Sequence, residues 1–125
     1  MRLKMPQNAS CVFCDIISGK IPAPRVYEDS QFICIRDIRP QAKTHLLMIP
    51  KEHVASLDEA FPQNSATKSQ LIGSLFEAAT HVARQEGLLP GGFRSVINTG
   101  VQGGQTVFHL HLHLLGGEIL RETFG

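Results

Sequence analysis

The chain of 125 residues has no tryptophan, one tyrosine and only three cysteines. So few cysteines, and an odd number of them, cannot build the disulfide framework of a small secreted domain, which favours a reducing compartment. No apolar run approaches the roughly 20 residues that a membrane-spanning helix needs. The segment Met1–Pro6 is basic and lacks the apolar core of a signal peptide. We therefore expect a cytoplasmic protein with no membrane partner.

Charge of either sign is also scarce. Charged residues make up 18% of the chain, and the net charge is +1. Because no run of lysine and arginine is long enough to follow a phosphate backbone, we expect no nucleic-acid partner. The length suits one hydrophobic core. We expect a flexible N-terminal arm over residues 1–9, where no periodicity is found, and a single domain over residues 10–125.

What the chain does contain is a row of histidines that alternate with leucines between Phe108 and Gly117. In a β-strand, residues two apart share a face. A strand here would place His109, His111 and His113 on one face and the leucines on the other. Packing alone explains such a row poorly, because each imidazole brings two ring nitrogens that need partners. The row predicts a strand with a chemically active face.

Hydrophobic periodicity predicts the remaining elements. An apolar stripe from Leu71 to Ala83 has three- and four-residue spacing, which indicates a long helix that begins after Ser65 and ends at Gly87. A shorter helix is predicted over residues 11–18 and one helical turn over residues 56–61. Strands are predicted over residues 26–28, 32–36, 45–49 and 93–98, besides the histidine strand. The fold class is therefore α+β, with a mainly antiparallel sheet of about five strands, one long helix and one short helix.

The histidine row is suited to attack on phosphorus. A neutral imidazole can form a phospho-imidazole intermediate, provided that the other ring nitrogen is held by an acceptor. Histidines on either side could donate to phosphate oxygens, so the middle residue, His111, is the predicted nucleophile. Gly103–Thr106 comes just before the row, and glycines let backbone N–H groups approach an anion. An ordinary turn is the alternative for this glycine pair.

The pattern His109-Leu-His111-Leu-His113-Leu-Leu resembles the signature of the histidine triad nucleotide-binding family. The agreement extends from about residue 11 to residue 117, and Gly116-Gly117 resembles the HINT branch in particular. The other agreeing stretches are Phe13-Cys-Asp-Ile-Ile17, Ile21-Pro-Ala23, Asp37-Ile-Arg-Pro-Gln-Ala42, Thr44 to His53, Asn98-x-Gly100 and Gly103-Gly-Gln-Thr106. The resemblance implies a homodimer whose sheet continues across the interface, with a purine nucleotide such as AMP or GMP as ligand.

The same resemblance implies hydrolysis of the bond between a nucleoside monophosphate and an amine through a nucleotidyl-histidine intermediate. His111 would be the nucleophile, His113 would bind the phosphate, and His45 would assist proton transfer. The implied nucleotide contacts are Phe13, Ile16 and Ile38 for the purine, Asp37 for the ribose, and Asn98, Gly104, Gln105 and Thr106 for the phosphate.

Plainer roles compete with these assignments. Asp37 could simply cap its own loop, and Asn98 could form a turn. Phe13 and Ile16 could be core residues only, and His45 could be a satisfied core histidine.

Cys11 and Cys14 have the spacing of zinc ligands, and two sulfurs with two imidazoles complete a tetrahedral site. The resemblance supplies His53 and His109 as the two imidazoles, so a structural Zn²⁺ is predicted and His111 stays free to attack. A redox CxxC pair would belong to a strand-to-helix turn of a βαβ unit, which the sequence does not predict. Two unpaired surface cysteines are the remaining alternative.

Two other functions remain open at this point. One is a dinucleoside polyphosphate hydrolase of the same superfamily, with the same nucleophile and a different leaving group. The other is a nucleotide-binding adaptor whose turnover is incidental. Gly116-Gly117 favours the phosphoramidase, and an intact histidine row argues against a scaffold because binding alone needs no nucleophile.

Overall fold

The structure, a computed structural model, describes residues 11–122, so the arm predicted over residues 1–9 lies outside it. Within this range the strands form one antiparallel sheet in the order β1-β2-β3-β5-β4. The elements in chain order are α1 (Val12–Ser18), β1 (Arg25–Glu28), β2 (Phe32–Arg36), β3 (Thr44–Pro50), α2 (Leu57–Ala60), α3 (Ser69–Gln85), β4 (Phe93–Val96) and β5 (Leu112–Gly116). The predicted α+β class and sheet are confirmed.

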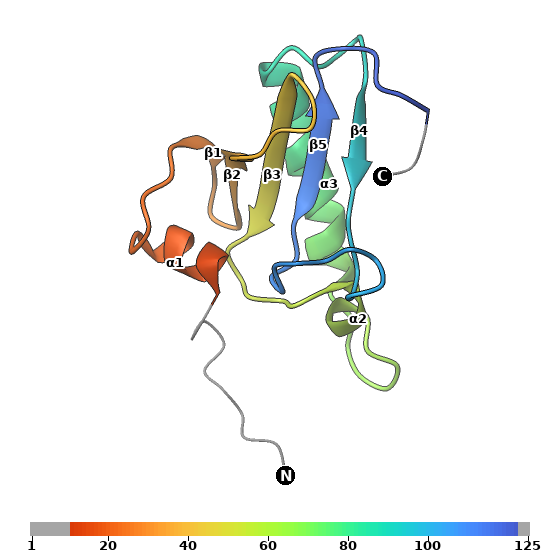
Figure 1. The fold of residues 1–125 in the computed structure, drawn as a ribbon. Coiled ribbons are helices and arrows are strands. Elements are labelled where there is room, and N and C mark those ends of the chain that lie inside the picture. Colours follow the sequence, from red (N-terminus) through yellow and green to blue (C-terminus); the bar gives the residue numbers. More distant parts are fainter. Residues whose placement is uncertain (1–10, 123–125) are drawn as a thin grey trace.

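Both faces of the sheet are covered, by different helices. The long helix α3 lies behind the strands in Figure 1, and α1 lies beside β2 and β3. In the central strand β3, Leu46 and Met48 pack with α3, whereas Leu47 and Ile49 pack with Phe13 of α1. A strand covered on both faces needs apolar side chains at successive positions, which explains the nearly continuous apolar run in β3.

The histidine strand is shorter than the sequence predicts, because β5 begins at Leu112 rather than at Phe108. Its ladder with β3 starts at the pair Met48–Leu112. In the same register Leu110 would face Pro50, which has no N–H group to donate. The backbone N–H of Leu110 instead donates to the carbonyl of Val54.

Strand β4 ends at Val96, not at Asn98, and its ladder with β5 ends at the pair Val96–His113. The alternation of side chains nevertheless holds beyond the ladder. The leucines at 110, 112 and 114 are buried with α3, while His109 and His111 contact Phe13.

No helix in the described part of the chain combines the length and the apolarity that crossing a membrane requires.

Truncation of Leu114 and of Leu115 tests which side chains face each side of the sheet. Leu114 is completely buried on the α3 side, and its neighbour Leu115 points to the other face and is half-buried. We expect Leu114→Ala to lower the free energy of unfolding by about 2–5 kcal/mol, because truncation leaves a cavity. The same truncation at Leu115 should cost clearly less. Chemical denaturation of both variants measures the difference, and equal losses would contradict the assignment of faces.

Candidate active site and metal cluster

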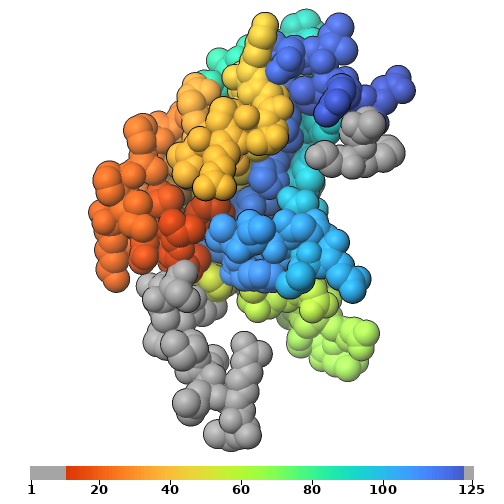
Figure 2. All heavy atoms as spheres, in the orientation of Figure 1, coloured from red at the N-terminus to blue at the C-terminus, as the bar shows by residue number. Residues whose placement is uncertain are grey.

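A pocket of about 400 Å³ opens on the α1 side of the sheet. Its walls come from α1, from the loop after β2 and from the loop before β5, and all three lie on the face shown in Figure 2. The structure brings most of the predicted nucleotide contacts together here. They are Phe13, Ile16, Asp37, Ile38, Asn98, Gly104, Thr106, His111 and His113.

His111 is held in one tautomer by its own backbone. Its Nδ1 lies 2.8 Å from the carbonyl oxygen of His109. A carbonyl can only accept, so Nδ1 carries the hydrogen and Nε2 of the neutral ring keeps its lone pair. The ring is buried, lines the pocket and packs edge-on against Phe13 at a centroid distance of 5.1 Å. His111 therefore presents an unprotonated nitrogen from a fixed ring.

A chain of hydrogen bonds also fixes His45 and His113. The backbone N–H of Gln41 donates to Nδ1 of His45, so Nε2 of that ring carries the hydrogen. This Nε2 lies 2.9 Å from Nδ1 of His113 and 3.4 Å from a carboxylate oxygen of Asp37. Since Nδ1 of His113 accepts, the hydrogen of neutral His113 is on Nε2. His113 is thereby a neutral hydrogen-bond donor in the wall of the pocket.

Burial keeps these rings uncharged. It lowers the pKa of His113 to about 4, helped by the neighbouring His111 and His45. Burial also lowers the pKa of His111 and of His45, and the Asp37 carboxylate works in the opposite direction on both. A histidine with a lowered pKa is neutral at pH 7, and the neutral form is the one that can act as a nucleophile.

Asp37 and Ile38 lie at the mouth of the pocket. One oxygen of Asp37 accepts from the backbone N–H of Arg39 at 2.8 Å, which is the loop-capping role considered above. The second oxygen is directed to His45. Ile38 lines the pocket and is 92% exposed, so its apolar side chain is accessible to a ligand there. Phe13 and Ile16, by contrast, are buried in the α1-side core and also line the pocket.

The glycine loop is closed more tightly than the sequence predicts. The backbone N–H groups of Gly103, Gly104 and Gln105 donate to carbonyls within the loop, and Asn98 donates to the carbonyl of Gly103. A Cβ on Gly103 would lie 2.3 Å from a backbone oxygen of Thr99, so only glycine fits there. These amides are thus already paired, and they do not form the open anion concavity that the sequence suggested.

Gln105 lies outside the pocket lining, with its side chain inside the loop. Its amide nitrogen donates to the carbonyls of Ala55 and Val107, and its oxygen accepts from the N–H of Gly100. The hydroxyl-bearing Thr106 does line the pocket. The contacts of Gln105 therefore support the loop that carries Thr106.

Four side chains far apart in sequence meet at the N-terminal end of α1. They are Cys11, Cys14, His53 and His109, and their donor atoms lie within 4.8 Å of one another. His109 donates from Nε2 to the carbonyl of Pro50, which leaves its Nδ1 bare, 3.3 Å from Sγ of Cys11 and 3.1 Å from Nδ1 of His53. Burial, with a contribution from Cys11, raises the pKa of Cys14 to about 12, so the thiol is protonated at pH 7 and metal binding would have to release that proton. This cluster could hold a metal ion.

Asp37, His45 and His113 are also within 4.8 Å of one another, but their hydrogen bonds do not suit a metal ion. A metal would need a lone pair on Nε2 of His45, and the N–H of Gln41 at Nδ1 places a hydrogen there instead. In the cluster of Cys11, Cys14, His53 and His109, the carbonyl of Pro50 accepts from Nε2 of His109 and so leaves a lone pair on Nδ1. We therefore interpret the Asp37 group as a hydrogen-bonded relay.

Sequence reasoning missed two backbone groups and several walls of the site. The N–H of Gln41 and the carbonyl of Pro50 set ring tautomers, and no side-chain pattern reveals such groups. Leu47 could have been found, because it lies two residues after His45 and so shares its face in β3. Val107 and Val12 complete the apolar wall.

Comparison with known proteins identifies close relatives. A family model described as scavenger mRNA decapping enzyme C-term binding matches residues 10–121. Purine nucleoside phosphoramidase of Escherichia coli K12 is 40% identical over 109 residues, which cover 87% of this chain and 88% of that protein.

Two solved structures also resemble the chain. A HIT family hydrolase from Legionella pneumophila Philadelphia 1 superposes with a TM-score of 0.82 at 44% identity, covering 90% of this chain and 97% of that one. A Zn-bound histidine triad family protein from Mycobacterium smegmatis gives a TM-score of 0.71 at 39% identity, covering 86% and 74%. These matches extend over nearly all of the chain and include the histidine row, so the chain belongs to the histidine triad family.

Proposed function

We propose that this protein is a nucleoside phosphoramidate hydrolase that works through a covalent nucleotidyl-histidine intermediate. The observation that carries the proposal is the fixed tautomer of His111, whose Nε2 lone pair belongs to a pocket-lining ring beside the donor His113. The activity named for the Escherichia coli relative supports the same reaction class. In this proposal Asp37 binds the ribose hydroxyls, and Phe13, Ile16 and Ile38 contact the purine; that all four line the pocket supports it.

The proposed reaction has two steps. In the first, the Nε2 lone pair of His111 forms a bond to phosphorus, and the phosphorus–nitrogen bond breaks with its electron pair going to the amine. The amine takes a proton from Nε2 of His113 while the hydrogen bond from His45 to Nδ1 holds that ring, and solvent returns a proton to Nε2 of His113, so both rings end neutral. In the second step, water attacks phosphorus, and the bond from phosphorus to Nε2 of His111 breaks with its electron pair returning to the ring. The nucleoside monophosphate leaves, and the proton of the attacking water passes to solvent. The carbonyl of His109 stabilises the charged ring of the intermediate.

His111→Asn tests the nucleophile. We expect turnover of adenosine phosphoramidate to fall by more than about 10⁴-fold, because the residue that forms the covalent bond is gone. AMP should still bind, since the apolar walls and Asp37 remain. His81→Asn is the matched control, because His81 is exposed on α3 and contacts Tyr27 instead of the pocket.

Single-turnover assays with adenosine phosphoramidate and a diadenosine polyphosphate, combined with calorimetric titration of AMP, measure both properties. Turnover retained in His111→Asn would contradict the covalent mechanism. Faster hydrolysis of the dinucleotide than of the phosphoramidate would favour the alternative hydrolase.

The metal cluster fits a structural Zn²⁺. Zinc–nitrogen bonds of about 2.0 Å and zinc–sulfur bonds of about 2.3 Å give tetrahedral edges of about 3.3–3.8 Å. The contacts among Cys11, Cys14, His53 and His109 are 3.1–3.5 Å, close to those edges. The zinc-bound relative from Mycobacterium smegmatis supports the same element. When bound, the ion would join α1 to the segment after β3.

Removal of one thiolate tests the metal. We expect about one equivalent of zinc in protein purified without chelator and less than a tenth of an equivalent in Cys14→Ser, because a hydroxyl is a poor zinc ligand. Cys34→Ser is the matched control, since Cys34 is fully buried between other strand residues and away from the cluster. Elemental analysis measures the content. Equal zinc in both variants would exclude the site.

The homodimer implied by the family resemblance would use β4 and α3. Strand β4 lies at the edge of the sheet with β5 as its neighbour, so its outer side can pair with a second strand. On α3, Phe76 is 42% exposed, and Leu71 and Ile72 are only partly buried. An apolar helix face beside an unpaired strand edge is what continuation of the sheet across a dimer requires.

Light scattering tests the assembly. We expect a mass twice that of the chain at micromolar concentration, and a monomer for Phe76→Asp, because a charge would be buried in the interface. Glu77→Asp is the control on the same helix, since Glu77 is exposed and keeps its charge. A monomeric unsubstituted protein would contradict the dimer.

A further inference from the structure

Strand β1 contains an irregularity that turns two charged side chains to the same face. Arg25 pairs with Ile35, but Tyr27 pairs with Cys34 and Glu28 with Ile33, so β1 has one extra residue. Val26 and Tyr27 consequently both pack on the α3 side. In a regular strand Arg25 and Glu28 would point to opposite faces. The bulge brings both to the α1 side, and bulges commonly redirect side chains beside functional sites.

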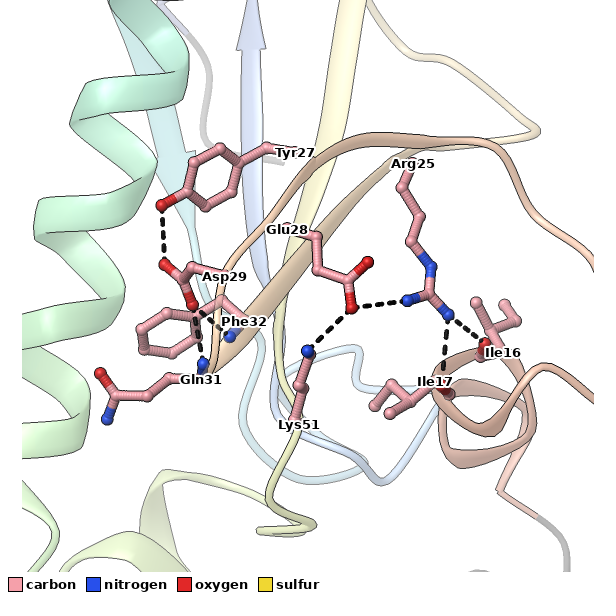
Figure 3. Close-up of polar contacts among 9 residues, drawn as sticks. All are labelled: Ile16, Ile17, Arg25, Tyr27, Glu28, Asp29, Gln31, Phe32 and Lys51. Carbon is pink, nitrogen blue, oxygen red and sulfur yellow. Dashed lines mark hydrogen bonds and ion pairs between the residues drawn. The ribbon is translucent and has the colours of Figure 1, made fainter.

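These two residues form a clasp with Lys51, which we name the Arg25 clasp. Arg25 Nη1 and Lys51 Nζ each lie 2.8 Å from the same carboxylate oxygen of Glu28. The other amino group of Arg25 donates to the carbonyls of Ile16 and Ile17, at 2.8 and 3.2 Å (Figure 3). The clasp thus connects the C-terminal end of α1 to β1 and to the residue that follows β3.

Helix α1 needs such an anchor. It has seven residues, fewer than an isolated helix needs for stability in water, and no basic residue in its own last turn. Carbonyls at the end of a helix lack intrahelical partners and carry partial negative charge. Arg25 supplies both N–H donors and a positive charge at this end, and Glu28 holds the guanidinium in place.

The two ends of α1 serve different parts of the site. At the N-terminal end, Phe13 lies between the clustered Cys11 and Cys14 and packs against His111. At the C-terminal end, Ile16 lines the pocket and its carbonyl accepts from Arg25. The metal cluster therefore supports the wall beside the nucleophile, and Arg25 supports the wall that Ile16 provides.

We propose that Arg25 is a positioning residue that holds the C-terminal half of α1 against the pocket and so sets the affinity for the nucleoside base. It contacts no reacting atom. This role rests on the proposed function, because it takes the pocket lined by Phe13 and Ile16 as the base site.

Arg25→Met tests the role, because methionine keeps much of the apolar stem and loses every donor. We expect Kd for AMP and KM for adenosine phosphoramidate to rise about 5- to 10-fold, with kcat within about twofold, as for an interaction made equally in ground and transition states. Kd for ribose 5-phosphate, which has no base, should stay within about twofold. Arg25→Lys should give Kd and KM values between those of Arg25→Met and of the unsubstituted protein, because one ammonium cannot donate to Glu28 and both carbonyls equally well.

Two further variants complete the experiment. Glu28→Gln leaves Arg25 in the chain but weakens its anchor, so it should shift AMP affinity in the same direction by less. Lys68→Met removes another short exposed ion pair, to Glu52 at 2.6 Å, and should change neither affinity. Zinc content and melting temperature are measured for each variant.

Equal loss of affinity for AMP and ribose 5-phosphate in Arg25→Met would show general destabilisation and overturn the positioning role. A fall in kcat at unchanged KM would overturn it as well. If the unsubstituted protein bound ribose 5-phosphate as tightly as AMP, or bound neither ligand, the proposed function itself would be contradicted, whatever the result for Arg25→Met.

Discussion

The hydrogen bond from the ring of His111 to the carbonyl of His109 is the contact on which the site depends. It decides which nitrogen of His111 has a lone pair, and it does so with a backbone group that cannot itself change protonation state. His109 is held in turn by Pro50 through Nε2, so its Nδ1 faces the two cysteines and His53. His109 thereby links the cluster of Cys11, Cys14 and His53, through its side chain, with His111, through its carbonyl.

A backbone group also fixes the ring tautomers at the other end of the histidine row. The N–H of Gln41 fixes His45, and His45 fixes His113. Each of these three rings could adopt two tautomers, and the hydrogen bonds select one for each. Among the described residues, no charged side chain hydrogen-bonds to His111. Because burial also lowers their pKa values, the rings remain neutral at pH 7.

The seven-residue helix α1 is held in place by the elements around it. Helix α3 covers one face of the sheet and makes most of the core, which leaves the other face available for the pocket. Helix α1 closes that second face, and it is too short to do so unaided. The cysteines secure its start, and the bulge in β1 brings Arg25 to its end. The wall of the pocket that α1 provides is consequently held at both ends of the helix.

The sequence by itself determined the periodic features of this protein. The alternation of histidine and leucine placed the rings on one face, and the stripe in α3 predicted the long helix, because both patterns follow from local backbone geometry. Only the tertiary structure decided where the histidine strand begins, because that depends on Pro50 in another strand. It also decided that Gln105 supports a loop, that Gln41 sets a tautomer, and that Arg25 meets Glu28 across a bulge. These features depend on backbone groups and registers distant in sequence, which no local pattern of side chains encodes.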